Sequence, residues 1–276
     1  MKTDKKNKKQ VSFTTMATPE WSVKKAITAA AKYGYSGIDL RAADYKGEVN
    51  IHTSDSEITN IRNILDSEKV ELAGLLCYNK VGGIEKDSWK EMEDSIVLHM
   101  ELGYKLGSPS IRIFGGDPHN NLKFNNYIKY IADTISSALD RFKGINITIQ
   151  NHKGSFTALE CVELIELVNN NRFRMVFSPD HSFMVGEDME KVYKAVMPYT
   201  FQLYISDVIR IKNNKYKSIL PGKGEVPIKK AYGAIACKNF NGYVTFKWEK
   251  IWQNYLEEPE IALPYFINNL KEILGN

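Results

Sequence analysis

Short apolar and β-branched runs alternate with longer segments of helical periodicity along the chain. A run that is apolar at every or every second position is typical of a strand, whereas apolar residues three and four positions apart indicate an amphipathic helix. The pattern predicts strands over residues 11–16, 36–41, 70–78, 109–116, 145–152, 173–179, 201–208 and 242–250. A helix is predicted after each strand, and two of the helix starts carry capping boxes, Ser54 with Glu57 and Thr157 with Glu160.

Eight strand-then-helix units follow one another without a linker or a break in composition. That number of units in about 250 residues is typical of a (β/α)8 TIM barrel, an α/β fold with a single domain. A doubly wound sheet is the main alternative, but it usually has fewer units, and the chain has neither a GxGxxG nor a P-loop motif. We therefore predict a flexible basic tail over residues 1–10 and a TIM barrel domain over residues 11–276.

The composition is that of an ordinary globular protein, with 43% hydrophobic and 25% charged residues. The net charge is +4, and lysines within the first ten residues supply much of it. No aromatic residue interrupts these lysines, so we expect a solvated terminus and no nucleic-acid partner. No apolar run is long enough to span a membrane. Cys77, Cys161 and Cys237 form no ligand or redox motif, which predicts reduced thiols and a cytoplasmic protein.

Chemically versatile side chains lie at the C-terminal ends of the predicted strands, where TIM barrels hold their active sites. His152 ends the fifth strand, and His181 follows the sixth. Because histidine titrates near neutral pH, both are candidates for general acid and base catalysis. The alternative for each is a buried histidine that is hydrogen-bonded to a strand-end carbonyl.

Several segments, taken in chain order, point to one family. They are YGYSGIDLR, IRIFGG, ITIQNHKG, FSPDHSFMVGED, LYISD, PGKGEVP and GYVTFKWE, and they span nearly the whole chain. Together they resemble the xylose isomerase-like TIM barrels, the sugar phosphate isomerase/epimerase group. The resemblance implies an isomerase or epimerase acting on a sugar, a polyol or a sugar phosphate, and a homodimer. It also implies a divalent metal such as Mn or Mg, held by Glu, Asp, His and Glu from strands five to eight.

The chain departs from this resemblance at all four metal positions. Gln150, Ser178, Tyr204 and Lys247 stand where the family pattern has Glu, Asp, His and Glu. The first three are at best weak neutral oxygen donors, and a protonated lysine repels a divalent cation. We therefore predict a sugar site without a cofactor, in which the Lys247 ammonium takes the place of the metal.

Other arrangements of the same residues remain open. Asp180 and Glu249 each lie two residues beyond a replaced position, and side chains alternate along a strand with a period of two. With His152 they would form a metal site displaced along the barrel. Lys247 has two further interpretations, as a nucleophile that forms a Schiff base and as a structural lysine paired with Asp207 or Glu249.

The predicted function is proton transfer on a small sugar-like or sugar-phosphate-like ligand. The alternatives are a catalytically inactive sugar-binding barrel and an isomerase or epimerase with the displaced metal site. The predicted catalytic residues are His152, His181, Lys247, Asp180 and Asp207. The predicted substrate-binding residues are Gln150, Asn151, Arg112, Tyr204, Ser178, Lys153, Arg210 and Glu249. We predict no metal ligand, no membrane partner and, from the resemblance, a homodimer.

Overall fold

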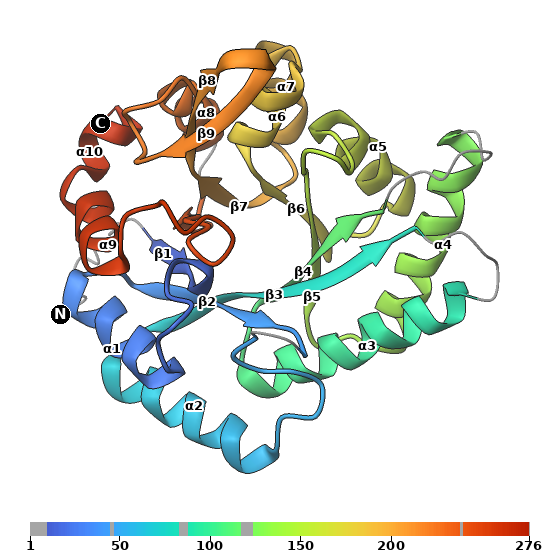
Figure 1. Ribbon diagram of the computed structural model, residues 1–276. Coiled ribbons are helices and arrows are strands. Elements are labelled where there is room, and N and C mark those ends of the chain that lie inside the picture. Colours follow the sequence, from blue (N-terminus) through green and yellow to red (C-terminus); the bar gives the residue numbers. More distant parts are fainter. Residues whose placement is uncertain (1–9, 45–46, 83–87, 117–123, 238–239, 276) are drawn as a thin grey trace, which may run out of the picture.

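Eight parallel strands close into a barrel in the computed structural model of the protein, which describes residues 10–44, 47–82, 88–116, 124–237 and 240–275 (Figure 1). The barrel strands are β1 (Val11–Thr14), β2 (Gly37–Ala42), β3 (Glu71–Val81), β4 (Ser110–Gly115), β5 (Asn146–Gln150), β6 (Phe173–Phe177), β7 (Thr200–Ile205) and β10 (Val244–Phe246). They follow one another around the ring in chain order, and β10 pairs with both β7 and β1. The predicted (β/α)8 TIM barrel is confirmed. Residues 1–9 of the predicted tail lie outside the described part of the chain.

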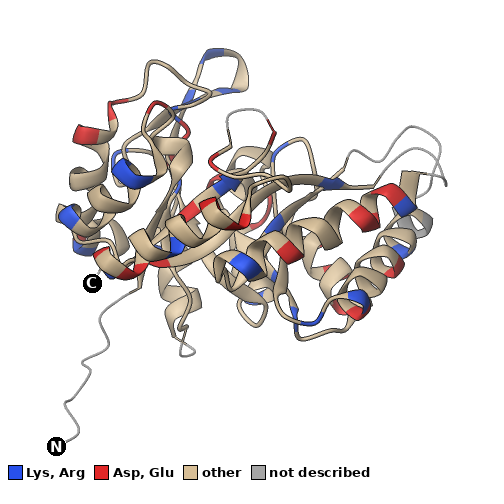
Figure 2. Ribbon diagram, turned by 90° about the horizontal axis from the view of Figure 1, so that it is seen from below, with Lys and Arg blue, Asp and Glu red and all other residues tan. Residues whose placement is uncertain are grey.

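Helices surround the barrel (Figure 1). They are α1 (Val23–Tyr33), α2 (Asp55–Glu68), α3 (Ser88–Leu106), α4 (Phe124–Arg141), α5 (Ala158–Val168), α6 (Pro179–Val185), α7 (Met189–Val196), α8 (Ile228–Ala236), α9 (Pro259–Asn268) and α10 (Leu270–Leu274). Both predicted capping boxes are present at the starts of α2 and α5. Acidic and basic residues are intermixed along the outer helices (Figure 2). Within the described ranges, no helix has the length and apolar character needed to cross a membrane.

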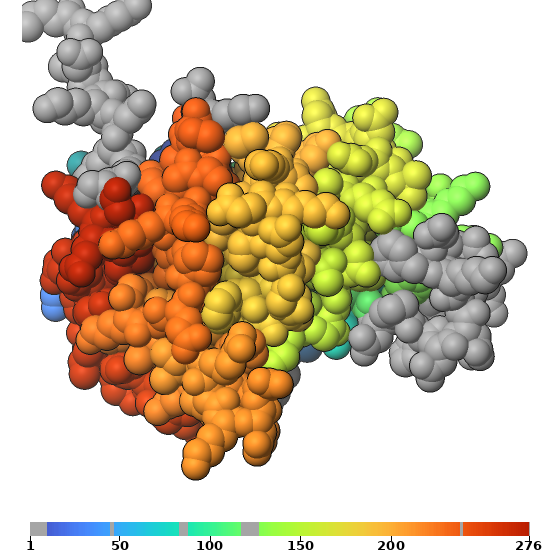
Figure 3. Space-filling model, turned by 90° about the horizontal axis from the view of Figure 1, so that it is seen from above, coloured from blue at the N-terminus to red at the C-terminus, as the bar shows by residue number. Residues whose placement is uncertain are grey.

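The sixth and seventh units differ from the prediction. The strand expected over 173–179 ends at Phe177, because Pro179 begins the short helix α6. The strand expected over 201–208 also splits, since β7 ends at Ile205 and the chain continues as a hairpin of β8 (Asp207–Ile211) and β9 (Lys215–Ile219). The hairpin lies beside α6 and α7 on one flank of the barrel (Figures 1 and 3), where the rings of Phe183 and Tyr216 are 6.1 Å apart.

A polar network occupies the middle of the barrel, which Val, Ile and Leu fill in most proteins of this fold. Gln202 Nε2 donates to both carboxylate oxygens of Asp39, at 2.9 and 3.0 Å, and Ser12 Oγ donates to Oδ2 at 3.2 Å. A Cβ atom at position 74 would lie 2.6 Å from Asp39 Oδ1, so Gly74 leaves the room that this carboxylate needs. Burial raises the pKa of Asp39 to about 7, although the hydrogen bonds from Gln202 and Ser12 oppose the rise.

Candidate functional site

Buried polar side-chain atoms that lack a hydrogen-bond partner gather at the C-terminal ends of the barrel strands. Among the described residues they include Thr14 Oγ1, Arg41 Nη1, Tyr78 Oη, and Nε and Nη1 of Arg112. Buried polar atoms are normally paired, so a group of unpaired ones indicates a place for a ligand or ordered water. A cavity of about 500 Å³ opens at this end of the barrel. This is the end at which TIM barrel enzymes carry out their chemistry.

The wall of this cavity carries more positive than negative charge. Four of its described side chains are basic, Lys80, Arg112, Lys153 and Lys247, whereas Glu249 is the single acidic one. A smaller cavity of about 160 Å³ shares Lys153, Lys247 and Glu249 with it. The charge balance favours a ligand with negatively charged or electron-rich oxygen atoms.

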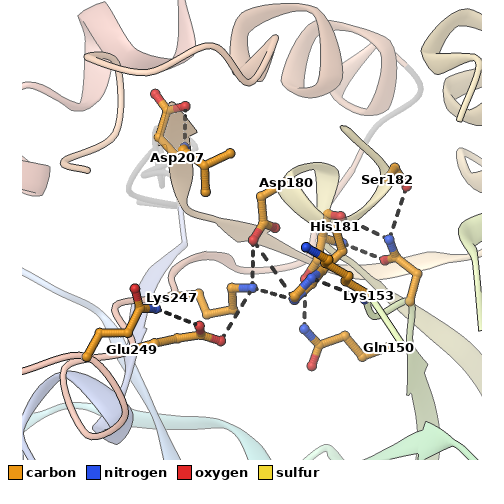
Figure 4. Close-up of polar contacts among 12 residues, drawn as sticks. Gln150, Lys153, Asp180, His181, Ser182, Asp207, Lys247 and Glu249 are labelled. Carbon is orange, nitrogen blue, oxygen red and sulfur yellow. Dashed lines mark hydrogen bonds and ion pairs between the residues drawn. The ribbon is translucent and has the colours of Figure 1, made fainter. Parts of the chain in front are cut away.

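Lys247 lies at the centre of the site and is the hub of an ionic cluster (Figure 4). Its Nζ donates to Asp180 Oδ2 at 2.8 Å, and Glu249 Oε1 lies 3.7 Å away. The side chains of Lys247 and Asp180 are 1% and 4% exposed. Burial alone would lower the pKa of Lys247, but the two carboxylates outweigh it and raise that pKa. Lys247 in turn holds the pKa of Asp180 well below its usual value despite burial, so the pair is ionised.

His181 is held from both sides of its ring. Its Nε2 lies 2.8 Å from Lys247 Nζ, and its Nδ1 accepts a hydrogen bond from the backbone N–H of Lys153 at 3.3 Å. Burial and the Lys247 charge lower the pKa of His181 well below its usual value, so the ring is neutral near neutral pH. A neutral imidazole has one acceptor nitrogen and cannot accept from both neighbours. The contact of Nε2 with Lys247 is the shorter of the two, and the tautomer of the ring decides which nitrogen accepts.

His152 stands next to His181 and lines the larger cavity. The centroids of the two imidazole rings are 4.1 Å apart, and the ring of Phe114 packs edge-on against His152 at 5.2 Å. Burial and the charge of Lys247 lower the pKa of His152. A neutral imidazole that faces a cavity is suited to accept a proton.

The four positions that replace the family's metal ligands satisfy one another or other protein groups. Gln150 Nε2 donates to Ser178 Oγ at 2.8 Å, the Tyr204 hydroxyl lies in hydrogen-bonding reach of Arg112, and Lys247 binds Asp180. This set does not fit a divalent cation, because it offers an ammonium and neutral oxygen atoms in place of carboxylates and an imidazole. Within the described ranges, no three His, Cys, Asp or Glu side chains converge as metal ligands, so Asp180, Glu249 and His152 do not form the displaced site.

Two of the predicted site residues lie away from this cluster. The Asp207 carboxylate points away from Lys247 (Figure 4) and shapes the loop after β9. It accepts backbone N–H groups of Val208, Gly222, Gly224 and Val226, at 2.8 to 3.0 Å. The alternative in which Asp207 pairs with Lys247 is therefore wrong, because Asp180 and Glu249 are the partners of Lys247 and backbone N–H groups bind the oxygens of Asp207. A role of Asp207 in proton transfer stays a prediction. Arg210 is exposed on β8, with its guanidinium 5.7 Å from the Tyr216 ring, and lies outside both cavities.

The other predicted binding residues come together around the cavity or support it. Asn151 does not line it, but Asn151 Oδ1 accepts the backbone N–H of Ser178 at 2.8 Å and its Nδ2 donates to Ser182 Oγ at 3.1 Å, which fixes the start of α6. Lys153 lines both cavities, and its ammonium lies 5.3 Å from the Tyr216 ring of the hairpin.

Sequence reasoning missed aromatic residues of the cavity wall. Trp252 lines the cavity and is 57% exposed, and Phe114 lies beside Arg112. An accessible aromatic face next to polar groups is suited to bind a sugar-like ligand. Trp252 lies just beyond the eighth predicted strand, and this position was the sequence signal that could have identified it as a site residue. The path of the chain after that strand is known only from the folded structure.

A larger cavity of about 880 Å³ opens at the opposite end of the barrel. Two of its charged side chains have partners in the protein. Arg62 donates to the Lys105 carbonyl, and Glu71 accepts from the Tyr243 hydroxyl at 2.5 Å. Features at this end of a TIM barrel usually serve stability, so we place the candidate site at the C-terminal end.

The fold and the site define the class of protein: a (β/α)8 barrel with a buried ionic cluster and a positively charged cavity at its C-terminal end. The model of the xylose isomerase-like TIM barrel family matches residues 27–264, so the chain belongs to that family. None of the curated protein sequences matches the chain.

Solved structures with the same fold include enzymes. A D-psicose 3-epimerase crystallised with D-fructose is 14% identical, with a TM-score of 0.79, and the match covers 97% of this chain and 100% of that one. An IolI protein with a bound zinc atom is 15% identical, with a TM-score of 0.81 and coverage of 96% and 98%. A probable 3-DHS dehydratase from Bacillus anthracis is 13% identical, with a TM-score of 0.73 and coverage of 95% and 98%. At these identities the similarity establishes the fold.

Proposed function

We propose that the protein is a sugar isomerase- or epimerase-like enzyme that moves protons on a sugar, polyol or sugar-phosphate derivative without a bound divalent metal. One observation carries the proposal. The Lys247 ammonium occupies a position at which the family pattern has a metal ligand, and the neutral His152 ring lines the same cavity. Family membership and the epimerases among the structural neighbours support sugar chemistry. The free thiols of the three cysteines support the cytoplasm as its compartment.

In the proposed reaction His152 removes a proton from the carbon next to the ligand's carbonyl group. The electron pair of the broken C–H bond forms a C=C bond, and the carbonyl oxygen gains negative charge. Lys247 stabilises that oxygen by donating a hydrogen bond or its proton. For an isomer, His152 returns the proton on the same face to the former carbonyl carbon, while the Lys247 amine takes the proton of the neighbouring hydroxyl group as the new carbonyl forms. For an epimer, the original carbon instead takes a proton from water on its opposite face, and His152 releases its proton to water.

The residues around Lys247 support both halves of this cycle. Asp180 holds the ammonium at 2.8 Å and keeps it charged while the substrate is bound. His181 stabilises the neutral amine, because its Nε2–H then has an acceptor and its Nδ1 still accepts from Lys153. The carboxylates of Asp180 and Glu249 raise the pKa of Lys247 against the effect of burial, so the amine readily regains its proton after it has donated one to the substrate oxygen.

Proton exchange in D₂O tests the proposal. Purified protein is incubated with a panel of ketoses, sugar phosphates and 3-oxo-sugars in the presence of EDTA, and deuterium at carbon is measured by NMR. We expect exchange that survives EDTA and falls by about 10²- to 10⁴-fold in His152→Asn. His99→Asn is the matched control, because the His99 ring lies on α3, where its Nδ1 is 2.8 Å from the Ser95 carbonyl oxygen.

Lys247 needs a paired variant, since its removal alone leaves the buried Asp180 charge without a counter-ion. Lys247→Met combined with Asp180→Asn removes both charges and should abolish exchange in a folded protein, as judged by circular dichroism. Exchange that requires Mn or Mg would refute the metal-free mechanism. Ligand binding without exchange across the panel would instead identify a sugar-binding barrel, and trapping of a lysine adduct by borohydride would indicate a Schiff base.

A further inference from the structure

Arg112 on β4 is a buried cation without a counter-ion. It is 3% exposed, and among the described residues no carboxylate forms an ion pair with it. Its Nε and Nη1 are buried and donate to no described protein acceptor, yet the side chain lines the cavity of about 500 Å³ at the C-terminal end. An unpaired buried charge costs several kcal/mol in general, so a fold that keeps one at a cavity wall has a use for it.

The neighbours of Arg112 orient the guanidinium without neutralising it. Its central carbon lies 3.9 Å from the centre of the Phe114 ring and 5.4 Å from that of Tyr78. Planar stacking of this kind fixes the guanidinium and leaves its N–H groups free to bind in the plane. The charge of Arg112 also acts on Asp39 in the barrel core, but Gln202 and Ser12 already bind the oxygens of that carboxylate.

Tyr78 adds a second donor at the same wall. Its hydroxyl is buried and has no partner among the described residues, and the ring lines the cavity beside Arg112. The charges of Arg112 and Arg41 both act on this hydroxyl. Unpaired N–H and O–H donors therefore gather in one region, and no acceptor in the described chain serves them. A group of donors that lacks an acceptor is suited to the oxygen atoms of an anion.

We propose that Arg112 and Tyr78 form an anion subsite, which binds a carboxylate or phosphate group of the ligand. The inference deepens the proposed function. It rests on that function only where it takes the bound anionic ligand to be the substrate. The subsite restricts the substrates to acidic sugar derivatives, such as sugar acids and sugar phosphates. Neutral sugars lack the group that the buried arginine needs, so they leave its charge uncompensated.

Calorimetric titration of the full chain with three related probes tests the subsite. D-Gluconate carries a carboxylate, D-glucose 6-phosphate carries a phosphate, and sorbitol is a neutral polyol of the same chain length. We expect at least one of the two anions to bind and sorbitol to bind at least about tenfold more weakly, because hydrogen bonds to a charged donor contribute about 1.5–3 kcal/mol. Binding of gluconate alone assigns a carboxylate, and binding of the phosphate ester alone assigns a phosphate.

Three variants locate the binding. Arg112→Gln should weaken the bound anion at least about tenfold, and Tyr78→Phe, which removes only the hydroxyl, should weaken it about threefold. Arg62→Gln removes the same charge from the opposite end of the barrel, where Arg62 lines the other cavity, and should leave the affinity unchanged. If Arg112→Gln does not fold, the effect of Tyr78→Phe and the preference of the natural protein for anions over sorbitol still test the subsite.

The proposal is overturned if neither anion binds, if sorbitol binds as tightly as the anions, or if a folded Arg112→Gln protein keeps the full affinity. These outcomes are separate from the fate of the proposed function. Anion binding that depends on Arg112, found in a protein without proton exchange, would retain the subsite and remove the enzyme. Proton exchange on neutral sugars alone would retain the proposed enzyme and overturn the anion subsite.

Discussion

The buried Asp39 carboxylate allows a quantitative test of the barrel interior. Its side chain is fully buried, and burial raises its pKa from 3.8 to about 7. A shift of one pKa unit corresponds to about 1.4 kcal/mol, so ionised Asp39 opposes folding by about 4 kcal/mol. Replacing Asp39 with Asn removes the charge but keeps an oxygen that accepts from Gln202 Nε2. The new amide N–H group can donate to Ser12 Oγ, which now lies 3.2 Å from the carboxylate.

The sign of the effect follows from proton uptake. Between the unfolded and folded pKa values of Asp39, the folded chain holds a proton that the unfolded chain has lost, so the natural protein loses stability as pH rises through this range. The Asp39→Asn variant lacks this pH-dependent contribution to stability, because its amide does not titrate. Its stability relative to the natural protein should therefore increase by about 3 kcal/mol between about pH 5 and about pH 8. The comparison of two proteins cancels the titration of all other groups that the substitution leaves unchanged.

Urea unfolding followed by circular dichroism measures this difference at each pH. Thr59→Ser, an exposed hydroxyl exchange on α2, serves as the control and should show no pH-dependent difference from the natural protein. A stability difference between Asp39→Asn and the natural protein that stays constant over the pH range would refute the reasoning. It would mean that Asp39 stays ionised in the folded state, with Arg112 compensating its charge.

Three further substitutions and modifications probe the site and the core. Asp180→Asn should lower the free energy of unfolding by about 3–5 kcal/mol, because it leaves the buried Lys247 ammonium without its main counter-ion; urea unfolding measures the loss. Gly74→Ala should lower the stability by about 1–3 kcal/mol and the melting temperature with it, since its Cβ would lie 2.6 Å from the Asp39 carboxylate; an unchanged melting temperature would contradict the packing. Cys237 is exposed and should react with a thiol reagent in the folded protein, whereas the two buried cysteines should react only after unfolding, as mass spectrometry of labelled peptides would reveal.

Local pattern predicted the elements well because each strand and helix has its own signal. Periodicity located all eight barrel strands, and the capping boxes at Ser54 and Thr157 located two helix starts. Periodicity failed after Ile205, where an apolar run continues into the hairpin β8–β9. The run stays extended in both halves, so its pattern does not reveal that the chain leaves the barrel there. The contacts of Asp207 with a loop about fifteen residues later decide it.

The candidate site followed only in part from the sequence. The rule that strand ends carry the chemistry selected Gln150, His152, His181 and Lys247, all of which the structure brings together. It could not show which carboxylate binds Lys247, because the partners come from different strands. It favoured Asp207 or Glu249, and the structure has Asp180 as the close partner and Glu249 as the more distant one.

The sequence by itself determined the barrel, its order of strands and the residue types at its C-terminal end, because these depend on hydrophobic period and on neighbours along the chain. Only the tertiary structure decided which side chains pair with one another and which of them are charged. It set the ionic cluster around Lys247, the two neutral histidines beside it and the unpaired donors of Arg112. The physical reason is that a pKa or an unsatisfied hydrogen bond depends on burial and on atoms a few ångströms away, and these atoms lie on strands far apart in the sequence.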